Sequence, residues 1–408
     1  MRRHSLYDPG LDVVRALACV LVIFHHVVLR WVAGSPQAWL ATSNGLVASA
    51  ARQEAAGGGM GVIYFYALSA FLLSKLALHE QRATGAIDFR KFWLRRCLRI
   101  WPLYYGFLLA LLALDHLPGF PALPGAPRTV GLFVFAFNWM GWQPETPSSI
   151  ASILWSVCVE EQFYVLFTLG LAFLGIRRLA QLALAFILLG PVCRAIVLTA
   201  GLPFPAVWIL TGSHLDAFGI GMGAAWLAER RPWAPGWITR VLLAVASILA
   251  PAVLASLLGA DLYGGWWTLA TYTLCALMAV LVIYALAGRT AHSRLGGLFL
   301  ATAVWVGRRA YGLYVFHWFA IKLVLWLRHP GAENVYSGVD AALSVLLTVT
   351  LAALSYRFWE EPFLRMKKRF EVVHSQPDSA LPIPHAAICN APSPTPDIAH
   401  AVSAERLK

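Results

Sequence analysis

The stretch LDVVRALACVLVIFHHVVLRWV, residues 11–32, decides the fold of this chain. A helix needs roughly 20 residues to cross the bilayer's hydrocarbon core of about 30 Å, and this apolar stretch is long enough. It nevertheless contains Arg15, His25 and His26. Ionisable residues are costly in hydrocarbon and mark functional positions in membrane helices. The stretch therefore predicts a spanning helix that carries chemistry.

The composition places the rest of the chain in the same class. Of 408 residues, 59% are hydrophobic and only 13% are charged, whereas soluble proteins carry about 25% charged residues. A water-soluble enzyme and a disordered chain are excluded. The formal net charge of +12 lies in short basic clusters between apolar runs, which is typical of membrane topology and not of nucleic-acid binding. The six cysteines form no CxxC pair and no histidine stands at metal spacing, so we expect neither a disulfide framework nor a metal site.

The apolar runs predict an all-α, polytopic membrane helix bundle of about ten spans. They cover approximately residues 11–32, 60–78, 100–115, 155–175, 179–199, 206–228, 238–258, 266–287, 308–327 and 340–361. With both termini in the cytoplasm, every basic cluster falls on the cytoplasmic side. An eleventh apolar stretch, 129–142, is shorter; counting it as a span would put Arg177 and Arg178 outside, so we favour ten.

The chain divides into two regions by composition. Residues 1–371 form the predicted transmembrane domain, beginning with an uncleaved span because no small-residue cleavage site follows the first apolar run. Residues 372–408 are rich in Pro, Ser, Ala and His, and too poor in large apolar residues to pack. We expect them to form a disordered cytoplasmic tail.

Arg15 and His26 share one face of the first helix. Eleven residues amount to three turns plus about 20°, and to about 16 Å of depth. His25 lies about 100° away, so only His26 aligns with Arg15. Two simpler interpretations remain open: His26 as a packed core histidine, and Arg15 as a side chain that extends to the headgroups.

Two carboxylates open the span that begins at Trp155. Glu160 and Glu161 differ by about 100° around a helix, so we expect only one to point inward, and Glu160 to be that one. A carboxylate facing His26 would orient the imidazole and stabilise its cation. Glu161 suits the alternative of an interfacial carboxylate near a helix N-terminus.

Other polar groups stand at informative positions. Arg96 and Arg99 lie at i, i+3, so they share a face that can bind phosphate, although topology anchoring alone would also explain them. Asp216 and His317 fall near mid-bilayer, where an isolated charge is hard to explain structurally. Arg357 and Glu360, also at i, i+3, predict a structural ion pair.

Six motifs, in order, resemble those of the acyltransferase 3 family of integral-membrane acyltransferases. They are residues 11–26 (the family's Arg, ten residues, His), 68–72 (like LSGF), 96–104 (like RxLRIxPLY), 155–164 (like WSLSVEEQFY), 311–318 (like YGLYLWHW) and 355–363 (like SYRFxExPF). The resemblance covers Leu11 to about Leu364. The chain departs from the usual residues at Val13, His25, Ala70 and Cys158, which affects the fine shape of the site and not its chemistry.

The resemblance implies an O-acyltransferase of the bacterial inner membrane that modifies surface carbohydrates. His26 would be catalytic, with Glu160 or Asp216 orienting it. Arg15, Arg96 and Arg99 would serve acyl-CoA, while His317 and Tyr311 would line the substrate site. Acyl-CoA is then a co-substrate, with no bound cofactor and no metal. The expected partners are a carbohydrate or glycolipid acceptor and the lipid bilayer, without nucleic acid.

Two further questions follow from the site. His26 can act as a general base for direct transfer, which we favour, or accept the acyl group itself. A proton-coupled transporter or flippase for a lipid-linked sugar would explain the buried polar residues as well, but not the ordered motifs.

Overall fold

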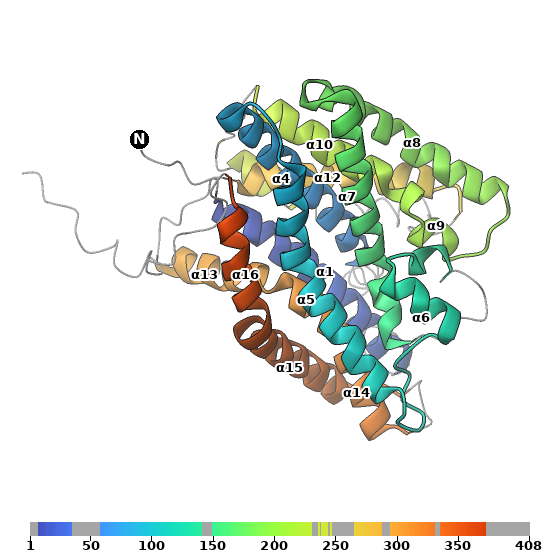
Figure 1. Cartoon of the computed structure of the whole chain (residues 1–408). Helices are drawn as coiled ribbons and strands as arrows, with labels where there is room; N and C mark the ends of the chain where they lie inside the picture. The colour runs from blue at the N-terminus through green and yellow to red at the C-terminus, as the bar shows by residue number, and fades with distance from the viewer. Residues whose placement is uncertain are drawn as a thin grey trace, which may run out of the picture.

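The computed structural model describes residues 7–34, 58–140, 149–230, 265–287, 294–330 and 335–372, together with short pieces between 236 and 246. Within these ranges the secondary structure is helical, without a strand (Figure 1). The longer helices are α1 (Pro9–Gly34), α4 (Gly61–Thr84), α5 (Phe89–Leu114), α7 (Trp155–Leu174), α8 (Leu179–Thr199), α10 (Leu215–Ala228), α12 (Thr268–Leu286), α13 (Arg294–Arg308), α14 (Ala310–Arg328) and α15 (Gly338–Ser355). The shorter ones are α6 (Ala126–Phe133), α9 (Ala206–Ile209) and α16 (Glu361–Lys367).

Eight segments of the described chain are long and apolar enough to cross a membrane. They are Pro9–Val27, Gly61–Thr84, Phe89–Leu114, Ile150–Leu174, Ile176–Thr199, Thr268–Leu286, Ala310–Arg328 and Gly338–Phe370. The predicted all-α multi-pass membrane bundle is confirmed, and these segments correspond to eight of the ten predicted spans. Most of the span predicted over 238–258, and the tail from residue 373, lie outside the described residues.

The span predicted over 206–228 is not one helix in the structure. The short helix α9 ends at Ile209, the backbone of Leu210 is extended, and a 3₁₀ turn (Thr211–His214) precedes α10. A broken helix leaves backbone carbonyls that must find partners inside the protein. Here the Ser213 carbonyl accepts a hydrogen bond from Arg194, so a buried side chain stabilises the break.

The stretch 129–142 does not form a span in its described part. Helix α6 has eight residues, or about 12 Å at 1.5 Å per residue, and Phe135, with a φ of 55°, follows it. A turn and a 3₁₀ segment (Phe137–Trp139) continue the chain. This part of the chain is too short to cross the bilayer, as the charge distribution predicted.

The core of the bundle forms around α4. This helix packs against α1, α10 and α12, while α14 packs against α15 and α1. Close approach depends on small residues, as is common between membrane helices: a Cβ at Gly221 of α10 would lie 2.1 Å from the Ala67 carbonyl oxygen of α4. The backbones of α4 and α10 are therefore in direct contact.

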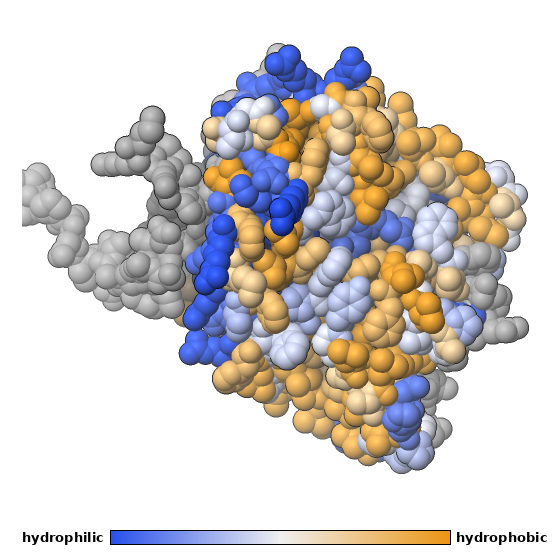
Figure 2. Space-filling view, viewed as in Figure 1, coloured by the Kyte–Doolittle hydropathy of each residue, from blue (hydrophilic) through white to orange (hydrophobic). Residues whose placement is uncertain are grey.

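The outer surface is largely apolar. On α8, Leu184, Leu188, Val192 and Ile196 recur every fourth residue and are all at least half exposed, which suits a helix facing lipid. Figure 2 shows apolar residues over much of the face in view, and hydrophilic ones where α16 lies and at the top of the view. Helix α16, which follows α15, packs against α5 (Figure 1).

The last long helix changes its register before α16. Residues Tyr356–Glu360 form a π-helix, which inserts extra residues into the turn. Arg357 consequently pairs with Glu361, at 3.5 Å, while Glu360 is buried and accepts a hydrogen bond from Ser355. The predicted Arg357–Glu360 ion pair is wrong because the π-helix turns Glu360 to the inner face.

Candidate active site

His26 lies where α1 meets α14. Its ring centroid is 5.0 Å from that of His317 and 5.1 Å from the Trp318 ring. The His26 Nδ1 atom lies 2.9 Å from the Val22 carbonyl oxygen one turn earlier. A carbonyl oxygen only accepts hydrogen bonds, so Nδ1 carries the proton and the ring orientation is fixed by its own helix.

His317 is fully buried on α14. Its Nδ1 atom donates to the Tyr314 carbonyl oxygen at 2.5 Å, and its Nε2 atom has no hydrogen-bond partner among the described residues. Buried polar atoms without a partner are rare and call for an explanation. Nothing in the sequence alone places His317 beside His26, since 291 residues separate them.

The tyrosines of α14 fix this helix to its neighbours. The Tyr311 hydroxyl donates to the Ile100 carbonyl oxygen of α5 at 3.1 Å. The Tyr314 hydroxyl shares a hydrogen bond with the Ser156 hydroxyl at 2.5 Å and donates to the Ile153 carbonyl oxygen at 3.1 Å. Tyr311, predicted to bind substrate, makes its described hydrogen bond to the backbone of α5.

Glu160 lies between α7 and α4. One of its oxygens accepts hydrogen bonds from the Ser69 and Tyr164 hydroxyls, each at 2.5 Å. It also interacts electrostatically with Arg96. These contacts join the Ser69 motif to the Glu160 motif; they do not include His26. That Glu160 orients His26 stays a prediction.

Glu161 is more deeply buried than the sequence suggests. Its side chain is 4% exposed, and Trp101 of α5 donates to it at 3.2 Å. The expectation that only one of the two adjacent carboxylates points inward is wrong. Helix α7 packs between two neighbours, so Glu160 contacts α4 while Glu161 contacts α5.

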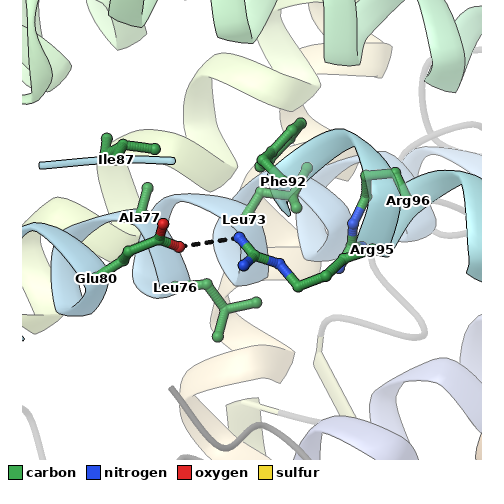
Figure 3. A pocket seen from close by; sticks show the side chains of 8 residues that line it. All are labelled: Leu73, Leu76, Ala77, Glu80, Ile87, Phe92, Arg95 and Arg96. Carbon is green, nitrogen blue, oxygen red and sulfur yellow. Dashed lines mark hydrogen bonds and ion pairs between the residues drawn. The ribbon is translucent and has the colours of Figure 1, made fainter. Parts of the chain in front are cut away.

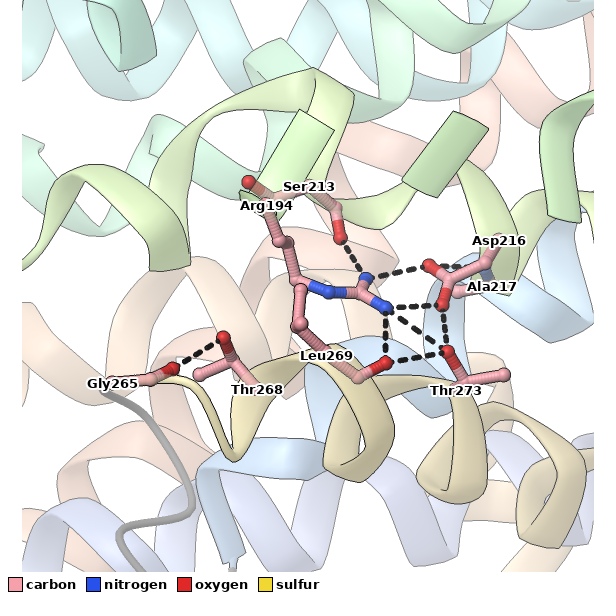
Figure 4. Close-up of polar contacts among 8 residues, drawn as sticks. All are labelled: Arg194, Ser213, Asp216, Ala217, Gly265, Thr268, Leu269 and Thr273. Atoms are coloured by element: carbon pink, nitrogen blue, oxygen red, sulfur yellow. Dashed lines mark hydrogen bonds and ion pairs between the residues drawn. The ribbon is translucent and has the colours of Figure 1, made fainter. Parts of the chain in front are cut away.

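Asp216 forms an ion pair with Arg194 inside the bundle (Figure 4). The guanidinium of Arg194 donates to both carboxylate oxygens, at 2.9 and 2.8 Å, and both side chains are fully buried. Thr273 donates to the same carboxylate, and Arg194 also donates to the Leu269 carbonyl. The pair thereby links α8, α10 and α12. The described contacts of Asp216 do not include His26.

Arg15, Arg96 and Arg99 come together at the other end of the site. Arg15 interacts electrostatically with Arg99, and Arg96 interacts with Arg99. Lys367 of α16 interacts with all three. We call these four residues the basic cluster. The structure therefore brings together the three arginines predicted for acyl-CoA, and adds Lys367, which the sequence did not identify as a site residue.

Carboxylates neutralise only part of the basic cluster. Arg15 is paired with Asp12, and Lys367 lies 3.6 Å from Glu371. Within the described residues, Arg96 and Arg99 have no carboxylate within 4.0 Å. Carboxylates act on these two guanidinium groups only from beyond 4.0 Å, Glu160 on Arg96 and Glu360 on Arg99. Like charges that are only partly neutralised favour an anionic ligand, because each guanidinium can donate to phosphate.

Asp12 contacts both Arg15 and Tyr7, which precedes α1. It is 2% exposed and accepts a hydrogen bond from the Tyr7 hydroxyl at 2.9 Å. Burial, followed by the charge of Asp12, raises the pKa of Tyr7 above its usual value. Tyr7 consequently keeps its proton at neutral pH and remains a donor to Asp12.

A small pocket lies beside Arg96 (Figure 3). Its lining is apolar (Leu73, Leu76, Ala77, Ile87, Phe92) apart from Glu80, Arg95 and Arg96. Arg95 is paired with Glu80 at 2.9 Å and donates to the Phe370 carbonyl oxygen. Arg95 is thus held by α4 and the segment after α16, whereas the buried Nε atom of Arg96 has no partner in the described chain.

The fold and the site define a multi-pass membrane protein with paired histidines at one end of α1 and a basic cluster at the other. Comparison with known proteins gives the class: a family model described as an acyltransferase domain matches residues 8–357. The chain belongs to this acyltransferase 3 family, as the six motifs predicted.

Two of the relatives found among curated proteins are named as O-acetyltransferases. O-acetyltransferase OatA of Staphylococcus aureus strain NCTC 8325 is 25% identical over 390 residues, covering 90% of this chain and 58% of its own. A putative O-acetyltransferase of S. aureus strain COL is 23% identical over 388 residues, covering 88% of this chain and 57% of its own. The chain therefore spans a little over half the length of these relatives. No solved structure matches it.

Proposed function

We propose that this chain transfers an acyl group, most readily acetyl, from cytoplasmic acyl-CoA to a hydroxyl of a carbohydrate or glycolipid. The names of its relatives support acetyl as the group. The acceptor would be a surface polysaccharide, a lipopolysaccharide or a similar glycan, and the location the bacterial inner membrane. Membership in the acyltransferase family supports the reaction type.

The observation that carries the proposal is the arrangement along α1. Arg15, in the basic cluster, and His26 stand on one unbroken helix, eleven residues and hence about 16 Å apart. CoA carries a diphosphate and a ribose phosphate, which the basic cluster would bind. The extended pantetheine arm is of comparable length to this separation, so it would bring the thioester to His26.

His26 then acts as the general base for direct transfer. It takes the proton of the acceptor hydroxyl as the oxygen attacks the thioester carbonyl, and CoA leaves as the thiolate. The other form, in which His26 itself becomes acylated, predicts an acyl-imidazole after incubation with acetyl-CoA alone. Rapid quenching and mass spectrometry of wild-type protein without acceptor separates the two forms.

Glu160 and Asp216 support the site through other residues. Glu160 interacts with Arg96, so we assign it to positioning the basic cluster. Asp216 keeps Arg194 paired and the helices around the broken α9–α10 segment in place. Tyr311 fixes α14 against α5, and through it the position of His317.

The test is transfer of radiolabelled acetyl from acetyl-CoA to cell-envelope glycans in membranes at matched expression. His26→Ala should lower transfer by roughly 10²-fold or more, the usual contribution of a general base. His25→Ala is the matched control, one position along the same helix, and should retain transfer. Equal loss in both variants, or label retained in His26→Ala, would remove His26 from the mechanism. If wild type gives no label with any acyl-CoA, a counterflow assay would test the transporter instead.

A further inference from the structure

The Nε2 atom of His317 makes no hydrogen bond within the described structure. Its side chain is fully buried, its Nδ1 atom donates to the Tyr314 carbonyl oxygen, and its Nε2 atom has no partner in the described chain. Because Nδ1 holds the proton, Nε2 carries a lone pair and is a proton acceptor. A neutral imidazole is thus held in one tautomer, with its basic nitrogen unoccupied.

The ring of His317 lies beside that of the proposed catalytic residue. The ring centroids of His317 and His26 are 5.0 Å apart, and the indole of Trp318 packs on His26 at 5.1 Å. The two histidines have the same construction: each donates from Nδ1 to a carbonyl of its own helix, three or four residues earlier. In each ring the Nδ1–H group fixes the orientation, and Nε2 is the basic atom.

The carboxylates that could have assisted His26 have other partners. Glu160 accepts from Ser69 and Tyr164, and Asp216 is paired with Arg194. A neutral imidazole beside His26 can receive a proton and release it again to the departing thiolate, so that no charge stays on the buried ring. The residue beside His26 therefore suits a proton relay.

We propose that His317 is a second catalytic residue, which passes the proton of the acceptor hydroxyl to the departing CoA sulfur. The inference deepens the proposed function and rests on it. His26 Nε2 takes the hydroxyl proton as the ester bond forms and the carbon–sulfur bond breaks. His317 Nε2 takes that proton from His26 and gives it to the CoA thiolate. One hydroxyl and one thioester become one ester and one thiol, and both histidines return to the neutral form.

The test compares His317→Ala, His317→Asn and wild type in membranes, by kcat and by KM for acetyl-CoA. Asparagine can accept a hydrogen bond but cannot carry a proton. We expect both variants to lose kcat by roughly 10²-fold with KM unchanged. Added imidazole should restore part of the kcat of His317→Ala, because a small base can occupy the vacated space and relay the proton.

His214 supplies a matched control. It is also fully buried, with one ring nitrogen 2.6 Å from a backbone carbonyl oxygen and the other without a partner in the described chain. It packs between Trp155, Trp208 and Tyr272. His214→Ala should lower the amount of folded protein and leave its kcat insensitive to imidazole.

The outcomes distinguish the proposed role of His317 from the proposed acyltransferase function. Wild-type kcat in His317→Asn, or no effect of imidazole on His317→Ala, would overturn the role of His317. In either case, transfer by wild type and its loss in His26→Ala would leave the proposed acyltransferase function intact. Absence of transfer by wild type would overturn the proposed function itself.

Discussion

Lys367 is a buried lysine that lies among guanidinium groups. It is 4% exposed and lies among the charges of Arg15, Arg96 and Arg99, with Glu371 as its described partner. Removing a lysine from water to place it beside three guanidinium groups costs free energy unless an anion binds there. A buried lysine in this place supports the proposal that the basic cluster binds the phosphates of CoA.

Replacing Lys367 should therefore weaken binding of the CoA phosphates. A charge-assisted hydrogen bond contributes about 1.5–3 kcal/mol, so Lys367→Met should raise KM for acetyl-CoA by roughly tenfold or more. The exposed neighbour Lys368 is the control, and Lys368→Met should leave KM unchanged. The discriminating donor is acetyl-pantetheine, which lacks the adenosine phosphates: its KM should be the same in both variants. A rise with both donors would show general damage instead.

The ion pair of Asp216 and Arg194 predicts a different behaviour. Removal of one member leaves a buried, uncompensated charge, which destabilises a protein by about 3–5 kcal/mol. Asp216→Leu should accordingly lower the thermal unfolding midpoint in detergent strongly, and addition of Arg194→Met should recover most of the loss. Transfer activity per folded molecule should follow this recovery. An inactive but stable double variant would instead place Asp216 in the chemistry.

At the scale of helices, hydropathy predicted where the spans lie in the sequence, but not which side chains they contact or where they break. The apolar runs located eight described spans, because length and composition determine whether a segment can cross a bilayer. They missed the basic first part of α5, which begins at Phe89 and not near residue 100. The same pattern could not reveal the break at Leu210, which depends on Arg194 reaching the Ser213 carbonyl. Nor could it reveal the π-helix that turns Glu360 inward.

The contact of α4 with α10 is a test at this scale. A Cβ at Gly221 would lie 2.1 Å from the Ala67 carbonyl oxygen, whereas a Cβ at Gly223 would lie 3.9 Å from the Ala183 side chain. Gly221→Ala should force the helices apart and cost about 1–3 kcal/mol, as overpacking does. Gly223→Ala should be neutral or stabilising. Equal unfolding midpoints for the two variants would contradict this packing.

For the whole molecule, the sequence predicted the site in part. Arg15 and His26 are eleven residues apart, so helix geometry predicts that they share one face, and both lie on the single helix α1 in the structure. Arg96 and Arg99 were found by their shared helix face. His317 and Lys367 could not be assigned to their neighbours, since they meet α1 and α5 only through the packing of helices far apart in the sequence. Glu160 and Asp216 were identified as buried polar residues, but their described partners depend on that packing too.

Topology remains a prediction of charge distribution, and it can be tested on α5. Thr84, before this helix, and His116, after it, are both exposed. With the basic cluster in the cytoplasm, a membrane-impermeant maleimide should label His116→Cys in spheroplasts and Thr84→Cys only after permeabilisation. Labelling of the native protein gives the background. The reverse pattern would place the basic cluster outside, away from cytoplasmic acyl-CoA.

The central claim is that the thioester of a CoA molecule held by the basic cluster meets His26. Bromoacetyl-CoA tests it directly, because its electrophilic carbon would occupy the place of the acyl group and alkylate the nucleophile nearest to it. Mass spectrometry of the labelled protein should find the adduct on His26, reduced by excess acetyl-CoA and by Arg99→Ala. An adduct confined to another residue, such as Cys97 on α5, or one that acetyl-CoA does not reduce, would contradict the claim.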